Sequence, residues 1–134
     1  MLLPHGAVIA LIDGRKFELY RNAGNEAAPK LEPLPVPKLD EHDKSAGADH
    51  YSSAGNPQAD LLGEDAHAAA VAAWLNEQVL GRKIESLVII AAPRTLGELR
   101  RHYHKATERA LVGDLAKDLA GRPATEVLEA LKGR

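Results

Sequence analysis

Short apolar and alternating runs predict β-strands in the first and middle parts of the chain. Residues 7–12 (AVIALI) and 87–91 (LVIIA) are continuous apolar stretches rich in β-branched side chains. Such runs are typical of strands that are buried on both faces of a sheet. Residues 16–21 (KFELYR) alternate polar and apolar side chains, which indicates a strand with one face in water. Asp13-Gly14 between the first two strands predicts a tight hairpin, since this dipeptide suits turn positions with positive φ.

Residues 31–37 carry a proline at every second position. Because alternate residues of a strand direct their N–H groups to the same side, Pro33, Pro35 and Pro37 remove donors from one edge only. Such a strand pairs through its other edge, so we expect it at the border of a sheet. A polyproline-type linker without strand pairing is the alternative interpretation of the same composition.

A long helix is predicted in the middle of the chain. Residues 66–80 are rich in alanine, and Val71, Leu75 and Val79 recur four positions apart. This spacing places the three side chains on one apolar helix face. Gly81 follows directly and is a plausible end of the helix.

The region after the second buried strand has mixed signals. Thr95 and Glu98 fit a capping box, which predicts that a helix begins at this point. The segment 108–119 is ambiguous, because its leucines recur as in a helix whereas residues 108–115 also fit a half-buried strand. Pro123 is expected to be the first residue of a last helix that runs through Leu131.

The order of these elements predicts the fold class. Three strands come first, and helices then alternate with two further strands, in the order βββ-α-β-α-β-α. A three-stranded meander continued by right-handed βα units gives a mixed five-stranded sheet with strand order 3-2-1-4-5. We therefore expect a single three-layer α/β domain over residues 1–134, with ribonuclease-H-like or translational-machinery-component topology. The proline-bearing strand then lies at an edge.

Residues 38–63 lack any sustained periodicity, and we expect them to form a long flexible loop. Asp40, Glu41, Asp43 and Asp49 make the segment acidic. Loops of this length within a compact domain are usually functional or disordered. One hypothesis for the function is therefore a protein–protein adaptor whose acidic loop folds on its partner.

Composition excludes several kinds of site. The chain has no cysteine, which excludes disulfides, cysteine-ligated metals and a thiol nucleophile, and its net charge is −2. The six histidines lack the His-x-x-x-His spacing of a helical zinc site. Asp13 ends the first strand, but no carboxylate ends the strand at 87–91, as a two-metal nuclease would require. We expect no metal, no cofactor, no membrane insertion and, without a signal peptide, a cytoplasmic location.

Positive charge is concentrated after the strand at 87–91. Only Glu98 and Glu108 oppose the cations in this stretch, and Arg94 precedes a helix N-terminus, which favours anions. The candidate phosphate- or RNA-binding residues are Arg94, Arg100, Arg101, His104, Lys105 and Arg109. A solvated helix face with intrahelical ion pairs is the alternative.

The string AAPRTLGELR at residues 91–100, the opening MLLPHG and Asp13-Gly14 resemble the bacterial host-attachment protein family. Its members are described as proteins required for attachment to host cells. That family in turn resembles the central domain of archaeal and eukaryotic class 1 peptide release factors. The resemblance runs over nearly the whole chain and implies a release-factor-like domain without the companion domains that recognise codons.

In release factors this domain carries a Gly-Gly-Gln loop that promotes peptidyl-tRNA hydrolysis. The nearest counterparts here are Gly55, Asn56 and Gln58, but the double glycine is missing. Pro57 precedes the glutamine and restricts the backbone on both of its sides. The resemblance thus offers the alternative of a hydrolase that acts on peptidyl-tRNA through the loop at residues 52–58, with Gln58 as the candidate catalytic residue. Our first expectation is instead a non-catalytic binding or regulatory protein associated with the ribosome or RNA.

Overall fold

A five-stranded mixed sheet forms the centre of the protein, with helices on both of its faces. In the computed structural model, residues 1–39 and 57–133 are described, with residues 57–60 described by their backbone only. The strand order is β3-β2-β1-β4-β5. The strands are β1 (Val8–Asp13), β2 (Lys16–Asn22), β3 (Leu31–Leu34), β4 (Leu87–Ala91) and β5 (Leu111–Ala116). The predicted α/β fold and its 3-2-1-4-5 sheet are confirmed.

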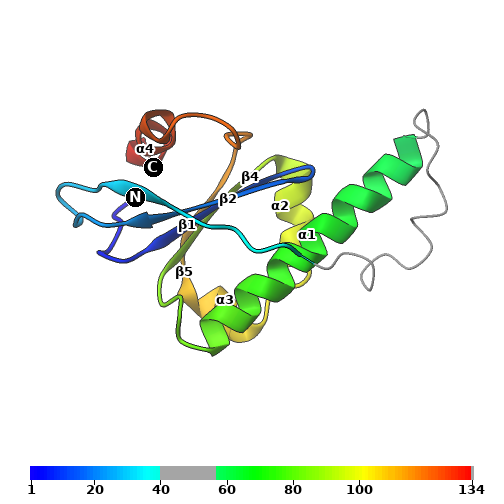
Figure 1. The fold of residues 1–134 in the computed structure, drawn as a ribbon, viewed down its shortest axis with the longest axis horizontal. Helices are drawn as coiled ribbons and strands as arrows, with labels where there is room; N and C mark the ends of the chain where they lie inside the picture. Colours follow the sequence, from blue (N-terminus) through cyan, green and yellow to red (C-terminus); the bar gives the residue numbers. More distant parts are fainter. Residues whose placement is uncertain (40–56, 134) are drawn as a thin grey trace.

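Four helices accompany the strands in the described residues. They are α1 (Pro57–Leu80), α2 (Pro93–Arg100), α3 (Lys105–Ala110) and α4 (Ala124–Lys132). Helices α1, α2 and α3 lie on one face of the sheet and α4 on the other (Figure 1). The ambiguous segment after α2 divides into the short helix α3 and the strand β5, which pairs in parallel with β4. The expected element order therefore gains one helix.

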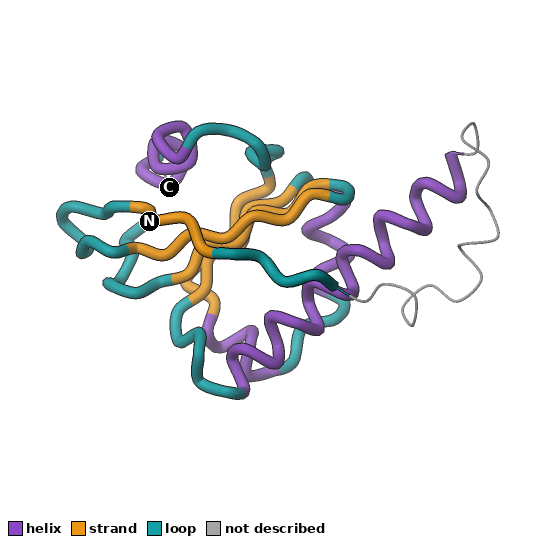
Figure 2. Tube along the Cα trace, in the orientation of Figure 1, coloured by secondary structure: helices purple, strands orange, loops and turns teal. Residues whose placement is uncertain are grey.

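The long helix begins earlier than its apolar pattern predicts. Helix α1 starts at Pro57 instead of residue 66, so the expected loop does not extend to residue 63. The first turns of α1 extend past the sheet (Figure 2), and Leu61 and Leu62 are exposed there. No apolar stripe marks this part of the sequence, which agrees with the exposure of these two leucines. A Cβ at Gly63 would collide with the Arg15 guanidinium, so glycine at this helical position leaves room for that side chain.

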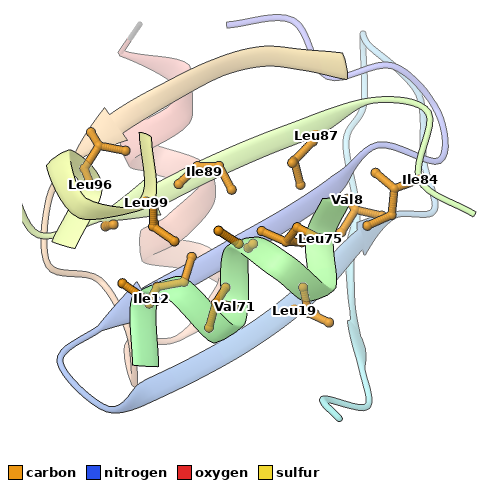
Figure 3. Close-up of a cluster of buried hydrophobic side chains, with 14 residues drawn as sticks. Val8, Ile12, Leu19, Val71, Leu75, Ile84, Leu87, Ile89, Leu96 and Leu99 are labelled. Atoms are coloured by element: carbon orange, nitrogen blue, oxygen red, sulfur yellow. The ribbon is translucent and has the colours of Figure 1, made fainter. Parts of the chain in front are cut away.

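The two central strands supply side chains to both hydrophobic cores. Every residue of β4 is buried, and so is every residue of β1 before Asp13. One core packs against α1 and α2 (Figure 3), and its members from the two strands are Val8, Ala10, Ile12, Leu87, Ile89 and Ala91. The other packs against Val127 and Leu131 of α4, and its strand members are Ile9, Leu11, Val88 and Ile90. Burial on both faces is thus confirmed.

The hairpin between β1 and β2 differs by one residue from the expected turn. Asp13 pairs with Lys16, so Gly14 and Arg15 form the two-residue loop. Gly14 has φ +53° and Arg15 does not have positive φ, a pattern that requires glycine only at the first loop position. Asp13 is consequently the last residue of β1, where its carboxyl group stands at the carboxyl end of the parallel strands.

The proline-bearing strand lies at the border of the sheet, as its missing donors predict. Strand β3 pairs antiparallel with β2, with Pro33 opposite Tyr20. Pro35 and Pro37 lie beyond the last strand residue, Leu34. The pairing excludes the alternative of an unpaired polyproline-type linker for residues 31–34.

The predicted capping box at Thr95 and Glu98 is wrong. Helix α2 begins two residues earlier, at Pro93, and Ala92 is its N-cap without any capping side chain. Proline is favourable at this first position because its ring fixes a helical φ and it lacks an N–H that would be left unbonded. Pro123, by contrast, lies one residue before the first residue of α4 and serves as its N-cap.

Asn22 fixes the turn between β2 and β3 from a fully buried position. Its Nδ2 donates to the carbonyl oxygens of Leu3 at 2.9 Å and Pro4 at 3.2 Å. Its Oδ1 accepts from the backbone N–H groups of Gly24 and Lys30, both at 2.9 Å. One side chain therefore joins the N-terminal segment to the start of β3.

Replacing Asn22 by alanine is expected to lower the free energy of unfolding by about 2–4 kcal/mol, because buried backbone groups lose their partners. Urea denaturation measures this change. The control is Asn25→Ala in the same turn, where the exposed Asn25 side chain accepts one bond from Ala28 N, and there we expect a loss below about 1 kcal/mol. Equal losses in the two variants would contradict the role assigned to Asn22.

Candidate functional site

The six basic residues singled out by the sequence are all exposed on α2, α3 and the turn between them. We call residues 93–110 the α2–α3 segment. The structure does not direct its cations to a single point. Arg94 reaches toward Asp65 of α1, whereas Arg100 reaches toward Asp114 of β5. Arg101 and the two cations of α3 are separate from both of these pairs.

Ion pairs neutralise much of the charge expected from this segment. Arg94 Nη2 donates to both carboxylate oxygens of Asp65, at 3.0 and 3.2 Å. Arg100 donates to Asp114 Oδ2 from Nη2 at 2.8 Å and from Nε at 3.3 Å. Both carboxylates belong to other elements, so five cations face four carboxylates when Asp65 and Asp114 are counted with the two local glutamates. These two pairs differ from the intrahelical pairs of the alternative interpretation, because their carboxylates come from α1 and β5.

The remaining cations, Arg101, Lys105 and Arg109, are more accessible to an anionic ligand. Arg101 Nη1 lies 3.4 Å from Glu98 Oε2, and its side chain is 75% exposed. Lys105 and Arg109 are exposed, and neither forms an ion pair with any residue in the described part of the chain. These two side chains can contact an anion without first giving up a carboxylate partner.

His104 has a structural role. It is the N-cap of α3, and its Nδ1 accepts a hydrogen bond from Ala106 N at 2.9 Å. This bond satisfies one of the N–H groups left without a partner at the start of a helix. One ring nitrogen of His104 is therefore engaged within the protein, which leaves only the other nitrogen for a ligand.

Asn76 of α1 holds the turn between α2 and α3 in place. Its Oδ1 accepts bonds from His104 N at 3.0 Å and from the hydroxyl of Thr107 at 2.6 Å. Its Nδ2 donates to His102 O at 2.9 Å. Thr107 is fully buried. We call these three bonds the Asn76 clamp. No sequence pattern predicts it, because the partners of a helical asparagine are known only once the fold is known.

A cluster of carboxyl groups forms at the carboxyl end of the parallel strands. The chain after β5 passes the β1–β2 hairpin, where Gly121 N donates to the carboxylate of Glu18. The pKa of Asp13 is raised above its ordinary value, first by burial and then by its hydrogen bond and charge interaction with Asp118. Lys16 lowers this pKa and the Glu64 carboxylate raises it further. A raised pKa means that this environment favours the protonated form of Asp13 over its carboxylate.

Metal binding finds no support in this cluster. Across residues 1–39 and 57–133, no three histidine or carboxylate side chains are grouped as a metal ion would require. His67, which is buried in α1, has its Nε2 3.2 Å from the carbonyl oxygen of Lys16. The cluster thus combines a raised Asp13 pKa with packing of the β1–β2 hairpin against α1.

The residues expected to correspond to the Gly-Gly-Gln loop are divided by the start of α1. Gln58 belongs to the first turn of this helix, so its placement in a loop is corrected. Gly55 and Asn56 lie outside the described residues, and so does the acidic stretch 40–49. The helix begins at Pro57 because proline suits a first helical position.

The structure defines a class of protein: an α/β domain with the sheet order β3-β2-β1-β4-β5 and a cationic pair of helices, α2 and α3. The model of bacterial archaeo-eukaryotic release factor family 12 matches residues 6–131, so the chain belongs to this family. No curated protein matches the chain. None of the helices that the structure describes combines the length and apolar character needed to cross a membrane.

Asp13→Asn is expected to raise the melting temperature at pH 7. The native pKa of Asp13 lies above the unfolded value of 3.8, so ionising this group as the pH rises destabilises the native state. The asparagine variant removes that penalty while it retains hydrogen-bonding atoms. Its advantage should shrink as the pH falls to about 3, where the aspartate is protonated in both states. Thermal melts at the two pH values measure the difference.

Asp118→Asn provides the matched control, because it removes the other carboxylate of the pair. It should change the melting temperature at pH 7 in the same direction as Asp13→Asn. A lower melting temperature for both variants at pH 7 would show that the two ionised carboxylates stabilise the fold, which would contradict this account.

Proposed function

We propose that this chain is a non-catalytic, cytoplasmic RNA- or ribosome-binding protein that contacts RNA through the α2–α3 segment. The observation that carries the proposal is the exposure of Lys105 and Arg109 without ion-pair partners among the described residues. Cations of this kind bind backbone phosphates and release condensed counterions. Membership of a release factor family supports a partner in translation.

The paired arginines extend the same surface. The side chains of Arg94 and Arg100 are each 56% exposed. Exposed ion pairs stabilise proteins by only about 0–1 kcal/mol, so a phosphate can compete with the carboxylate at little cost. The contact with RNA begins at α3 in this account, and the arginines of α2 then exchange their carboxylates for phosphates.

The Asn76 clamp keeps this surface in a fixed arrangement. It joins α1 to two residues of the α2–α3 turn and to Thr107 of α3 through three hydrogen bonds. A preorganised surface loses less conformational entropy when it binds than a flexible one. Asn76 is thus a positioning residue, while the cations make the contacts.

The double variant Lys105→Ala/Arg109→Ala is expected to weaken binding to a short single-stranded RNA and to purified ribosomes. The slope of log affinity against log salt concentration should become shallower by roughly one unit for each cation removed. Filter binding over a range of salt concentrations measures both effects. The loss should not depend on RNA sequence, because phosphate contacts carry no sequence information.

The control is Lys117→Ala/Lys132→Ala, which removes the same charge from exposed positions outside the α2–α3 segment. This variant should retain affinity and salt slope to within the smaller effect of net charge. If the two double variants lose affinity equally, binding depends on overall charge and the proposed surface is wrong.

A further inference from the structure

Two adjoining hollows lie at the end of the sheet where β1 and β4 begin, opposite the carboxyl cluster around Asp13. The first has a volume of about 380 Å³ and is mainly apolar, with walls that include Leu19, Leu34, Trp74 and Ile84. The second has a volume of about 290 Å³ and is mainly polar, with walls that include His5, Arg82 and Glu85. Arg21 and Lys83 line both hollows, so the two hollows are neighbours.

The polar hollow has an excess of positive charge. Arg21, Arg82 and Lys83 have no ion pair with any residue in the described ranges, and Glu85 is the single carboxylate in its lining. Three cations that line one hollow without ion-pair partners repel one another, and a bound anion reduces that repulsion. The geometry therefore favours a ligand group with more than one negative charge, such as a phosphate monoester.

The backbone at Arg82 supports a role for its side chain. Arg82 has φ 60°, and it is the one residue other than glycine with positive φ in the part of the chain described. It follows the end of α1, where glycine is the residue that accepts this conformation without strain. An arginine held there against its backbone preference lines the polar hollow, and such strain is commonly retained where a side chain has a function.

The apolar hollow suits a flat ring. The Trp74 ring meets Phe17 edge to face, with ring centroids 5.8 Å apart, so packing fixes its orientation. Gln78 also lines this hollow, and its side-chain amide has no hydrogen bond to another described residue. An amide can both donate to and accept from the edge of a nucleobase. The volume of the apolar hollow is within the usual range for small-molecule pockets.

We propose that the two hollows together bind a nucleoside phosphate. The base occupies the apolar hollow against Trp74 and Gln78, and the phosphate lies among Arg21, Arg82 and Lys83. This site is distinct from the α2–α3 segment and does not depend on the proposed RNA contact. The same chemistry occurs in a free nucleotide and in the 5′-phosphorylated end of an RNA strand.

Trp74 is the sole tryptophan of the chain and reports directly on the site. AMP and UMP should change its fluorescence in a saturable manner, and calorimetry should give the same dissociation constant. Adenosine, which lacks the phosphate, should bind about tenfold or more weakly, because the cations then make no contact. A 5′-phosphorylated dinucleotide that binds as tightly as AMP identifies an RNA end as the ligand, whereas weaker binding identifies free nucleotides.

Arg82→Gly separates binding from folding. Glycine relieves the positive φ, so the melting temperature should stay the same or rise while AMP affinity falls about tenfold or more. Arg21→Met, which keeps much of the aliphatic stem, should also weaken AMP binding. Lys117→Ala/Lys132→Ala, which removes two exposed cations that line neither hollow, is the matched control and should bind AMP as the unmodified protein does. The absence of AMP binding at millimolar concentration, or unchanged affinity in both Arg82→Gly and Arg21→Met, would overturn the proposal.

Discussion

Burial of β1 and β4 on both faces is the constraint on which the rest of the structure depends. Alternate side chains of these strands supply two cores, one beneath α1 and α2 and one beneath α4. Each fully buried aliphatic side chain contributes about 1.5–3 kcal/mol relative to its exposed state. Because the centre of the sheet is filled by such side chains, functional groups are left to its two ends and to the outward surfaces of the helices.

The polar groups that remain inside the protein position these outer parts. Asn22 fixes the β2–β3 turn at one end, and Asn76 fixes the α2–α3 turn against α1. Each side chain uses both its donor and its acceptor atoms, and each reaches groups that are distant in the sequence. The cationic surface and the hollows are therefore held by an aliphatic sheet and by a small number of amide contacts.

The sequence predicts the sheet better than it predicts the helices. Strand character at residues 7–12 and 87–91 and the edge position of β3 follow from local features, namely apolar runs and proline spacing. The start of α1 does not, because its first turns extend past the core and carry no apolar stripe. Helix α3 has six residues, too few to establish a periodicity.

In the candidate site, too, local features could be predicted from the sequence and contacts between distant segments could not. Exposure of the six basic residues could be predicted from the charge pattern of residues 94–109. Their pairing with Asp65 and Asp114 could not, because these partners come from α1 and β5 and only the fold brings them close. The hollow lined by Arg21 and Arg82 was missed for the same reason, since its cations belong to separate segments.

The central claim is that RNA meets this protein on the α2–α3 segment, in the arrangement held by Asn76. The most direct measurement is the change in backbone amide NMR shifts when a short single-stranded RNA is added to the isotope-labelled protein. The account predicts the largest changes at residues 101–109, with smaller changes at Arg94 and Asp65. Changes confined to other parts of the chain, with residues 101–109 unaffected at saturation, would contradict it.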